Sequence, residues 1–281
     1  MTPETPRVAV VIPCFNDGML ALEAVASIRE AEPVEVIVID DASSDPASGR
    51  ALDDLADHPF ARVIRHPANR GLAAARMTGV HATAGRYVFP LDADDLAQPG
   101  ALARMADLLD AHAWAAVCFG DYLEFGDHEL VRAVPLTLDP YRVAYTNEYP
   151  PSALFRRTVL ERLGGWQLDD VGYEDWDLWM TLAEASEQGI HAGHGFLTYS
   201  RRLHGTRMLT RSKRDHARLY RLLRRRHATL FGGIQAHRRA SDMSTGRKLL
   251  YPIVYGGRRR FGFERRIKAT LDAMGVWTLR R

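Results

Sequence analysis

Short, mainly apolar segments alternate with helical patterns along the first half of the chain, and the first of them is continuously apolar. We expect these segments to be strands, because a strand that is buried on both faces shows no polar alternation. They are Val8–Ile12, Val34–Ile39, Ala61–Ile64, Tyr87–Leu91 and Ala115–Phe119. Strands that alternate with helices of about ten residues indicate a doubly wound α/β sheet with parallel strands.

The helices between these strands are predicted from apolar spacing. Met19–Glu30 and Leu72–His81 follow the first and third strands, and Ser152–Phe155 is read as a further strand before a short helix at Thr158–Leu163. A later helix starts at Tyr173, and its apolar residues recur at positions i, i+3, i+4 and i+7, which predicts a buried stripe. The stripe consists of Trp176, Trp179, Met180 and Ala183.

Polar residues end each predicted strand, and three carboxylates follow the Tyr87–Leu91 strand: Asp92, Asp94 and Asp95. The ends of parallel strands lie at one edge of a sheet, where ligands bind in open α/β folds. Two Asp residues separated by one residue can place hard oxygen ligands on one divalent cation, which can also hold a diphosphate. A turn that merely caps the next helix is the alternative, and the preceding strand favours the ligand site.

The chain of 281 residues allows one large α/β domain, or one domain with a helical annex. Cys14 and Cys118 lie in apolar runs and are expected as buried free thiols in a reducing compartment. The first seven residues lack a signal-peptide pattern, and no apolar run approaches the roughly 20 residues that span a bilayer. We therefore expect a cytoplasmic protein.

Charge is distributed unevenly along the chain. Residues 1–200 carry 14 arginines and 31 acidic residues, a net charge of −17, whereas residues 201–281 carry a net charge of +19. An acidic body with a basic tail indicates an anionic partner for the tail. No nucleic-acid-binding motif accompanies the basic residues, and the acidic body would repel a phosphate backbone, so nucleic acid is not expected as that partner.

Six motifs occur in an order that is far more specific than any one of them. They are Ile12–Asn16, Asp40–Asp45, Asn69–Gly71 with Ala75-Arg76, Leu91–Asp95, Gly164–Trp166 and Glu174–Leu178. Together they closely resemble the family 2 glycosyltransferases with the GT-A fold, over roughly residues 7 to 205. The resemblance implies a mixed, doubly wound sheet in a catalytic domain at 1–205. Its nucleotide-sugar half would span about 7–120, its acceptor half about 121–205, and a basic, mainly helical annex would occupy 206–281.

The resemblance also implies roles for individual residues in binding a nucleotide-sugar. Pro13 and Phe15 would line the base pocket, Asp41 would hydrogen-bond the base, and Asp40 or Asp92 would contact the ribose region. Further nucleotide-sugar contacts are expected from residues at matching positions: Asn16, Gly71, Arg76, Ala93 and Glu174. Arg76 could equally form an ordinary ion pair with a nearby aspartate. Asp45 is expected as a turn or cap residue.

The same resemblance assigns the metal and the general base. Asp94 matches the aspartate that binds Mn²⁺ or Mg²⁺, and Asp175 matches the base that deprotonates the acceptor hydroxyl. A single base implies direct displacement with inversion. His204 could be a third metal ligand, bind the diphosphate, or be an exposed loop histidine. The segment Tyr199–Gly205, expected after the last strand, has one extra residue before His204 compared with the family's pattern.

We therefore expect a metal-dependent glycosyltransferase that uses a nucleotide-sugar, with UDP favoured, and a glycan or lipid-linked acceptor. The alternatives are a non-catalytic protein that binds nucleotide-sugars or anionic surfaces, and an enzyme acting on a small-molecule acceptor. A dinucleotide-dependent oxidoreductase is disfavoured, because Pro13–Asn16 stands where a Gly-rich turn is needed. The sequence names neither the sugar nor the acceptor, and it leaves the oligomeric state open, a homo-oligomer included.

The annex contains a basic amphipathic pattern. Leu219, Leu222 and Leu223 alternate with arginines, as in a helix that lies on a membrane, here the inner face. The alternative is that the leucines pack on the catalytic domain and the arginines are solvated or paired with its acidic body.

Overall fold

The structure, a computed structural model, describes residues 6–168, 172–203, 215–256 and 270. It contains two compact units. We call the first the sheet unit; it comprises Met1–Thr137, Pro150–Asp169 and Glu187–Gly205. The second, the helical unit, comprises Leu138–Tyr149, Asp170–Ser186 and Thr206–Arg281. The expected free cysteines, Cys14 and Cys118, are both buried in the sheet unit.

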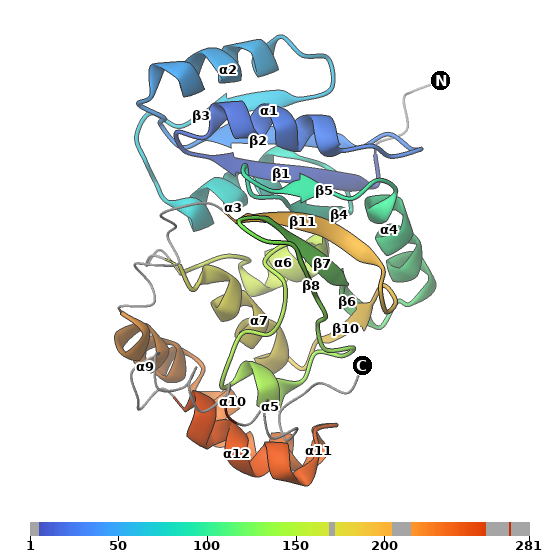
Figure 1. Cartoon of the computed structure of the whole chain (residues 1–281), viewed down its shortest axis with the longest axis vertical. Helices are drawn as coiled ribbons and strands as arrows, with labels where there is room; N and C mark the ends of the chain where they lie inside the picture. The colour runs from blue at the N-terminus through green and yellow to red at the C-terminus, as the bar shows by residue number, and fades with distance from the viewer. Residues whose placement is uncertain (1–5, 169–171, 204–214, 257–269, 271–281) are drawn as a thin grey trace. The chain divides into compact units, whose positions relative to one another are not determined.

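The main sheet has the order β10-β6-β9-β4-β1-β2-β3 among the described residues (Figure 1). Its strands are β1 Val8–Cys14, β2 Glu35–Asp40, β3 Arg62–Arg65, β4 Tyr87–Pro90, β6 Ala115–Phe119, β9 Leu154–Arg156 and β10 Gln188–His191. β9 runs antiparallel to both of its neighbours, β4 and β6, whereas the other pairs are parallel. The expected mixed, doubly wound sheet is therefore confirmed.

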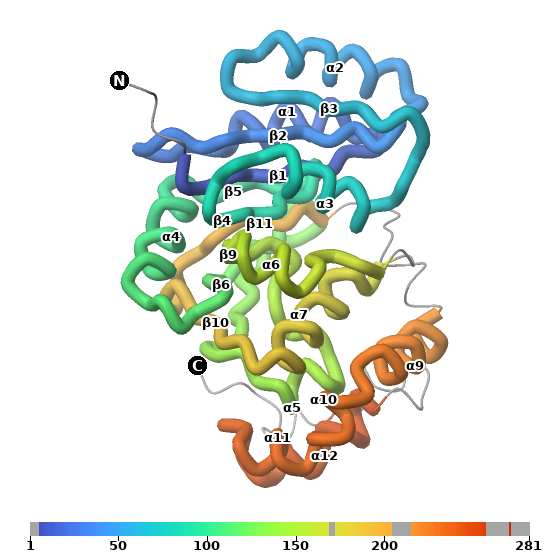
Figure 2. Tube along the Cα trace, turned by 180° about the vertical axis from the view of Figure 1, so that it is seen from behind, coloured from blue at the N-terminus to red at the C-terminus, as the bar shows by residue number. Residues whose placement is uncertain are grey.

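Strand β1 shows why the apolar segments lack alternation. Val8, Val10 and Ile12 belong to the core cluster that includes residues of α1 and α4. Val11 points to the other face, where α3 packs so closely that a Cβ on Gly79 would lie 2.2 Å from Val11 Cγ1. Both faces are covered, so each position of β1 is buried. Figure 2 shows α3 beside β1 and β2 from behind.

The helices of the sheet unit are α1 Gly18–Ser27, α2 Pro46–Ala56, α3 Leu72–Ala82, α4 Ala101–Ala111 and α6 Arg157–Leu163. α1 packs against α2 and β1, and α4 against β6. A second sheet of the described chain has the order β5-β11-β7-β8. Its strands are β5 Leu96–Ala97, β7 Asp121–Gly126, β8 Leu130–Arg132 and β11 Leu197–Leu203.

The second sheet corrects one sequence expectation. The segment that begins at Tyr199 was expected to follow the last strand, but the structure places Tyr199 within β11, paired with Ala97 on one side and Tyr122 on the other. The Tyr199 ring is fully buried and stacks on that of Tyr122, with ring centroids 5.0 Å apart. The Arg201-Arg202 pair that follows therefore projects from a strand, which fixes its position.

The helical unit contains α5 Pro140–Val143, α7 Glu174–Glu184, α9 His216–Arg226, α10 Ala228–Gly232, α11 Ile234–Ala240 and α12 Thr245–Tyr255. The expected stripe of α7 is buried from Trp176 to Ala183. On α9, Leu219 and Leu223 are buried, so these two leucines pack within the protein, and Leu222 is half-buried. Within the described ranges, no helix has the length and apolar character that a bilayer crossing requires.

Candidate functional site

The parallel strands of the main sheet end at one edge. Cys14 at the end of β1 pairs with Asp40 at the end of β2, and Val11 of β1 pairs with Pro90 at the end of β4. The loops that follow these strands therefore emerge together. Phe15, the first residue after β1, keeps 46% of its surface exposed, whereas Pro13 is buried within the strand.

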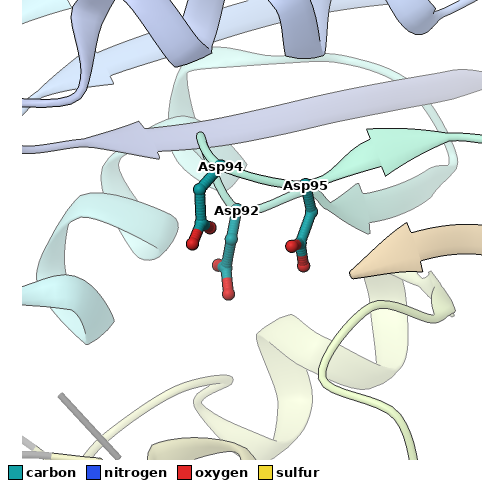
Figure 3. Close-up of side chains that lie close together, drawn as sticks. All are labelled: Asp92, Asp94 and Asp95. Carbon is teal, nitrogen blue, oxygen red and sulfur yellow. The ribbon is translucent and has the colours of Figure 1, made fainter. Parts of the chain in front are cut away.

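The three predicted aspartates come together in the loop after β4. The Asp95 N–H donates to the Asp92 carbonyl at 3.0 Å and closes a tight turn around Ala93, which is buried. Asp92, Asp94 and Asp95 each bring a carboxylate oxygen within 4.8 Å of the others. Their side chains point to the same side of the loop (Figure 3).

Crowding of negative charge perturbs this cluster. Asp92 and Asp94 are partly exposed, and Asp95 is buried. Burial, reinforced by the charges of Asp92 and Asp94, raises the pKa of Asp95 well above its ordinary value, although the Arg202 N–H opposes the shift. Three hard oxygen donors at such separations, with mutual repulsion that a cation would relieve, fit a Mn²⁺ or Mg²⁺ ion.

Arg76 approaches the cluster from α3. Its side chain is 1% exposed, and its Nη2 donates to Asp92 Oδ1 at 2.7 Å. The guanidinium also lies over the ring of Trp166, 5.5 Å from the ring centroid, which joins the Gly164-Gly165-Trp166 motif to the site. The ion pair that the sequence left open is thus confirmed. Support of a nucleotide by Arg76 stays a prediction.

Asp41 organises the turn that carries Gly71. Its Oδ1 accepts hydrogen bonds from His66 Nδ1 at 2.7 Å and from the Arg70 N–H at 2.8 Å, and its Oδ2 accepts from the Gly71 N–H at 2.8 Å. Gly71 has a φ of +88°, a value that glycine adopts most easily. A carboxylate offers about four acceptor sites, and these contacts occupy three of those of Asp41, two on Oδ1 and one on Oδ2.

Asn16 and Asp40 hold the neighbouring loop. Asn16 Oδ1 accepts from the backbone N–H groups of Ser44 and Asp45, and Asp40 Oδ1 accepts from that of Ser43 at 2.8 Å. Asp45 caps α2 by accepting from the Ala47 and Ser48 N–H groups, which confirms its expected cap role. Asn16 therefore shapes the loop, whatever it contributes to a ligand.

Arg202 is a contributor that the sequence did not single out for this loop. Its backbone N–H donates to Asp95 Oδ1 at 2.9 Å, and its Nε donates to the Asp94 carbonyl at 3.0 Å. Nη2 pairs with Glu23 of α1 at 2.6 Å. These contacts connect β11 to the loop that carries Asp92, Asp94 and Asp95, more than 100 residues earlier in the sequence. No local sequence pattern predicts a contact over such a separation.

The Glu174-Asp175 pair opens α7 in the helical unit. Glu174 is buried and Asp175 is half-buried. Asp177, also in the first turn of α7, is 1% exposed, and its Oδ1 lies 2.9 Å from both Arg226 Nε and His227 Nε2. His204, the candidate third ligand, lies outside the described residues.

Comparison with known proteins identifies the class of protein. The sequence profile of glycosyl transferase family 2 matches residues 9–164, more than half of the chain. The chain belongs to glycosyl transferase family 2. Its fold is that of the GT-A glycosyltransferases: it superposes on S. aureus TarS in complex with UDP-GlcNAc with a TM-score of 0.66 and 18% identity, covering 96% of this chain and 78% of that one.

Two further likenesses are informative. The mannosyltransferase PcManGT from Pyrobaculum calidifontis, in complex with GDP-Man and Mn²⁺, matches with a TM-score of 0.58 and 20% identity, over 96% of this chain and 76% of that one. The succinoglycan biosynthesis protein ExoO of Rhizobium meliloti is 34% identical over 177 residues, 56% of this chain and 50% of that protein. The chain thus matches half of that curated relative's length.

Proposed function

We propose that the chain is a metal-dependent glycosyltransferase that moves a sugar from a nucleotide-diphospho-sugar, a UDP-sugar in preference, to a hydroxyl of a glycan or lipid-linked acceptor. The observation that carries the proposal is the carboxylate cluster Asp92, Asp94 and Asp95 at the edge of the sheet in a family 2 chain. UDP-GlcNAc and GDP-Man with Mn²⁺ in the structural neighbours support the donor class and the metal.

Residues of the sheet unit would bind the nucleotide-sugar donor. Asp94, with Asp92, would hold Mn²⁺ or Mg²⁺, which as a bound Lewis acid offsets the charge of the diphosphate leaving group. The remaining acceptor site on Asp41 Oδ2 suits an N–H of the base, and the exposed ring of Phe15 suits its apolar face. Arg76 keeps Asp92 oriented through its ion pair.

Asp175 would activate the acceptor. Its carboxylate would take the proton of the acceptor hydroxyl while that oxygen forms a bond to the anomeric carbon of the donor. The bond between this carbon and the diphosphate oxygen breaks in the same step, so the configuration inverts. The half-buried position of Asp175 in the first turn of α7 supports this role, because the helix N-terminus favours an ionised carboxylate.

The relative ExoO is named for succinoglycan biosynthesis, which favours assembly of a cell-surface polysaccharide as the setting. A thermal-shift screen of nucleotide-sugars with and without Mn²⁺ tests the donor. A ligand at about 100 times its Kd adds about 2.7 kcal/mol of stability. Release of the nucleoside diphosphate separates an enzyme from a protein that only binds, since the latter would be stabilised without turnover.

The metal assignment is tested by Asp94→Asn. We expect loss of Mn²⁺-dependent donor binding with an unchanged fold, because Asp94 lies in a partly exposed loop. Asp54→Asn, an exposed aspartate of α2, is the matched control and should bind as the wild type does. Undiminished turnover by Asp94→Asn would remove this residue from the metal site.

A further inference from the structure

The family profile ends at residue 164, before α7 begins, and α9 and α10, which contact this helix, also lie beyond the matched residues. His227 lies at the junction of α9 and α10 and is 2% exposed. Its Nε2 lies 2.9 Å from Asp177 Oδ1, and its Nδ1 lies 2.9 Å from Glu184 Oε2. One imidazole ring therefore bridges two carboxylates that are two turns apart on α7.

Further contacts reinforce the bridge. Both ring nitrogens of His227 lie within hydrogen-bond distance of a carboxylate oxygen. Arg226 Nε lies 2.9 Å from Asp177 Oδ1, and the Leu230 N–H donates to Glu184 Oε1 at 3.0 Å. The junction of α9 and α10 thus contacts both ends of α7.

A second set of contacts reaches the start of α7. Tyr173 is the N-cap residue directly before Glu174-Asp175, and its hydroxyl lies 2.5 Å from His216 Nδ1 at the start of α9. The rings of Trp176 and Tyr220 stack at a centroid distance of 5.6 Å. Trp176 also donates to the Val143 carbonyl at 2.6 Å, so α9 and α5 together fix the rotation of the first turn.

We propose that His227 is a positioning residue for the Glu174-Asp175 pair: by bridging Asp177 and Glu184, it sets the orientation of α7 and thereby of the carboxylate at Asp175. The helices α9 and α10 then serve the acceptor half of the reaction as a fixed support. This inference rests on the proposed role of Asp175 as the general base.

The test compares His227→Ala and His227→Gln with His237→Ala, which alters a half-buried histidine of α11. We expect His227→Ala to lower kcat about 10- to 100-fold, since a misplacement of about 1 Å can cost 100-fold. The KM for the donor should change less than about twofold. His227→Gln, which retains one N–H donor, should recover part of kcat, and His237→Ala should match the wild type.

Hydrogen exchange gives a readout that does not depend on turnover. Exchange of residues 173–178 should accelerate in His227→Ala and stay unchanged in His237→Ala. Wild-type kcat in both His227 variants, a rise in donor KM that accounts for the lost activity, or unchanged exchange would each overturn the proposal. If His227→Ala does not fold, His227→Gln carries the same comparison. An inactive wild type would instead count against the glycosyltransferase assignment, while the exchange data would still decide whether His227 holds α7.

Discussion

Replacing Asp41 with Asn tests whether its three hydrogen bonds hold the turn at Gly71. Asp41 is 4% exposed, and each of its oxygens accepts from a buried or half-buried donor. Asparagine offers one oxygen and one NH₂ group. The less costly orientation keeps the oxygen facing His66 and Arg70 and turns the NH₂ group towards the Gly71 N–H, so that two donors face each other.

The expected loss of stability follows from the number of hydrogen bonds that Asp41→Asn breaks or weakens. One buried N–H without an acceptor costs about 1–3 kcal/mol, and the two remaining bonds lose the strength that a charged acceptor adds. The Gly71 N–H also lies 3.2 Å from Asn69 Oδ1, which limits the loss. We therefore expect Asp41→Asn to lower the free energy of unfolding by about 2–3 kcal/mol, which corresponds to a fall in Tm of about 3–5 °C for a chain of this length.

Thermal unfolding followed by circular dichroism measures this change, with Asp54→Asn as the control. Asp54 is exposed, so its variant should stay within about 0.5 kcal/mol of the wild type. A second measurement, donor binding by calorimetry, should show weaker binding for Asp41→Asn. A Tm equal to that of Asp54→Asn would refute the reasoning, because the hydrogen bonds at Asp41 would then contribute nothing to the turn.

Three further predictions concern the helical unit. Asp175→Asn should bind the donor normally and lower transfer by about 10²–10⁴-fold, and a parallel collapse of donor binding would move the base elsewhere. The pKa of Glu184 is lower than its ordinary value. Burial alone would raise this pKa, but hydrogen bonds from the His227 ring and the Leu230 N–H lower it. Its stabilisation is therefore present above the unfolded pKa of about 4.3 and is lost as pH falls through the folded value. Glu184→Gln should accordingly lower the Tm at neutral pH, with a difference that shrinks in melts at acid pH. The exposed arginines of α9 should bind anionic vesicles at low salt but not at high salt, because the leucines beneath them are buried. Flotation should weaken at least about tenfold in the double variant Arg218→Glu, Arg221→Glu, and equal flotation of the two proteins would argue against this surface.

The sequence predicted the parallel half of the sheet and the meeting of the three aspartates, because both depend on local patterns. Strands buried on both faces are continuously apolar, and their carboxyl ends must share one edge. The place of β9 between β4 and β6 could not be predicted, because three residues carry no period and sheet order depends on long-range pairing.

The partners of the site residues were harder to predict than the residues themselves. Asp95 and Arg202 are 107 positions apart, and Asp177 and His227 are 50 apart. In both cases one partner belongs to a short motif, whereas the other partner is a backbone N–H or a side chain that no sequence pattern marks as a site residue. Asn16 was expected to contact a ligand, yet the structure also uses its side chain to hold Ser44 and Asp45, a role that only the loop geometry reveals.

The position of β9 has a consequence for how the chain folds. β9 pairs with β4 at Tyr87 and Val88, almost 70 residues earlier, and with β6 on its other side, so this short strand is the link between two parts of the main sheet. The parallel strands β1 to β4 can associate as they leave the ribosome, but β6 cannot join them until residue 156 has been synthesised. Closing so long a loop is slow compared with local pairing. The edge of β4, directly before the loop that carries the three aspartates, therefore stays without its partner strand until β9 has been synthesised.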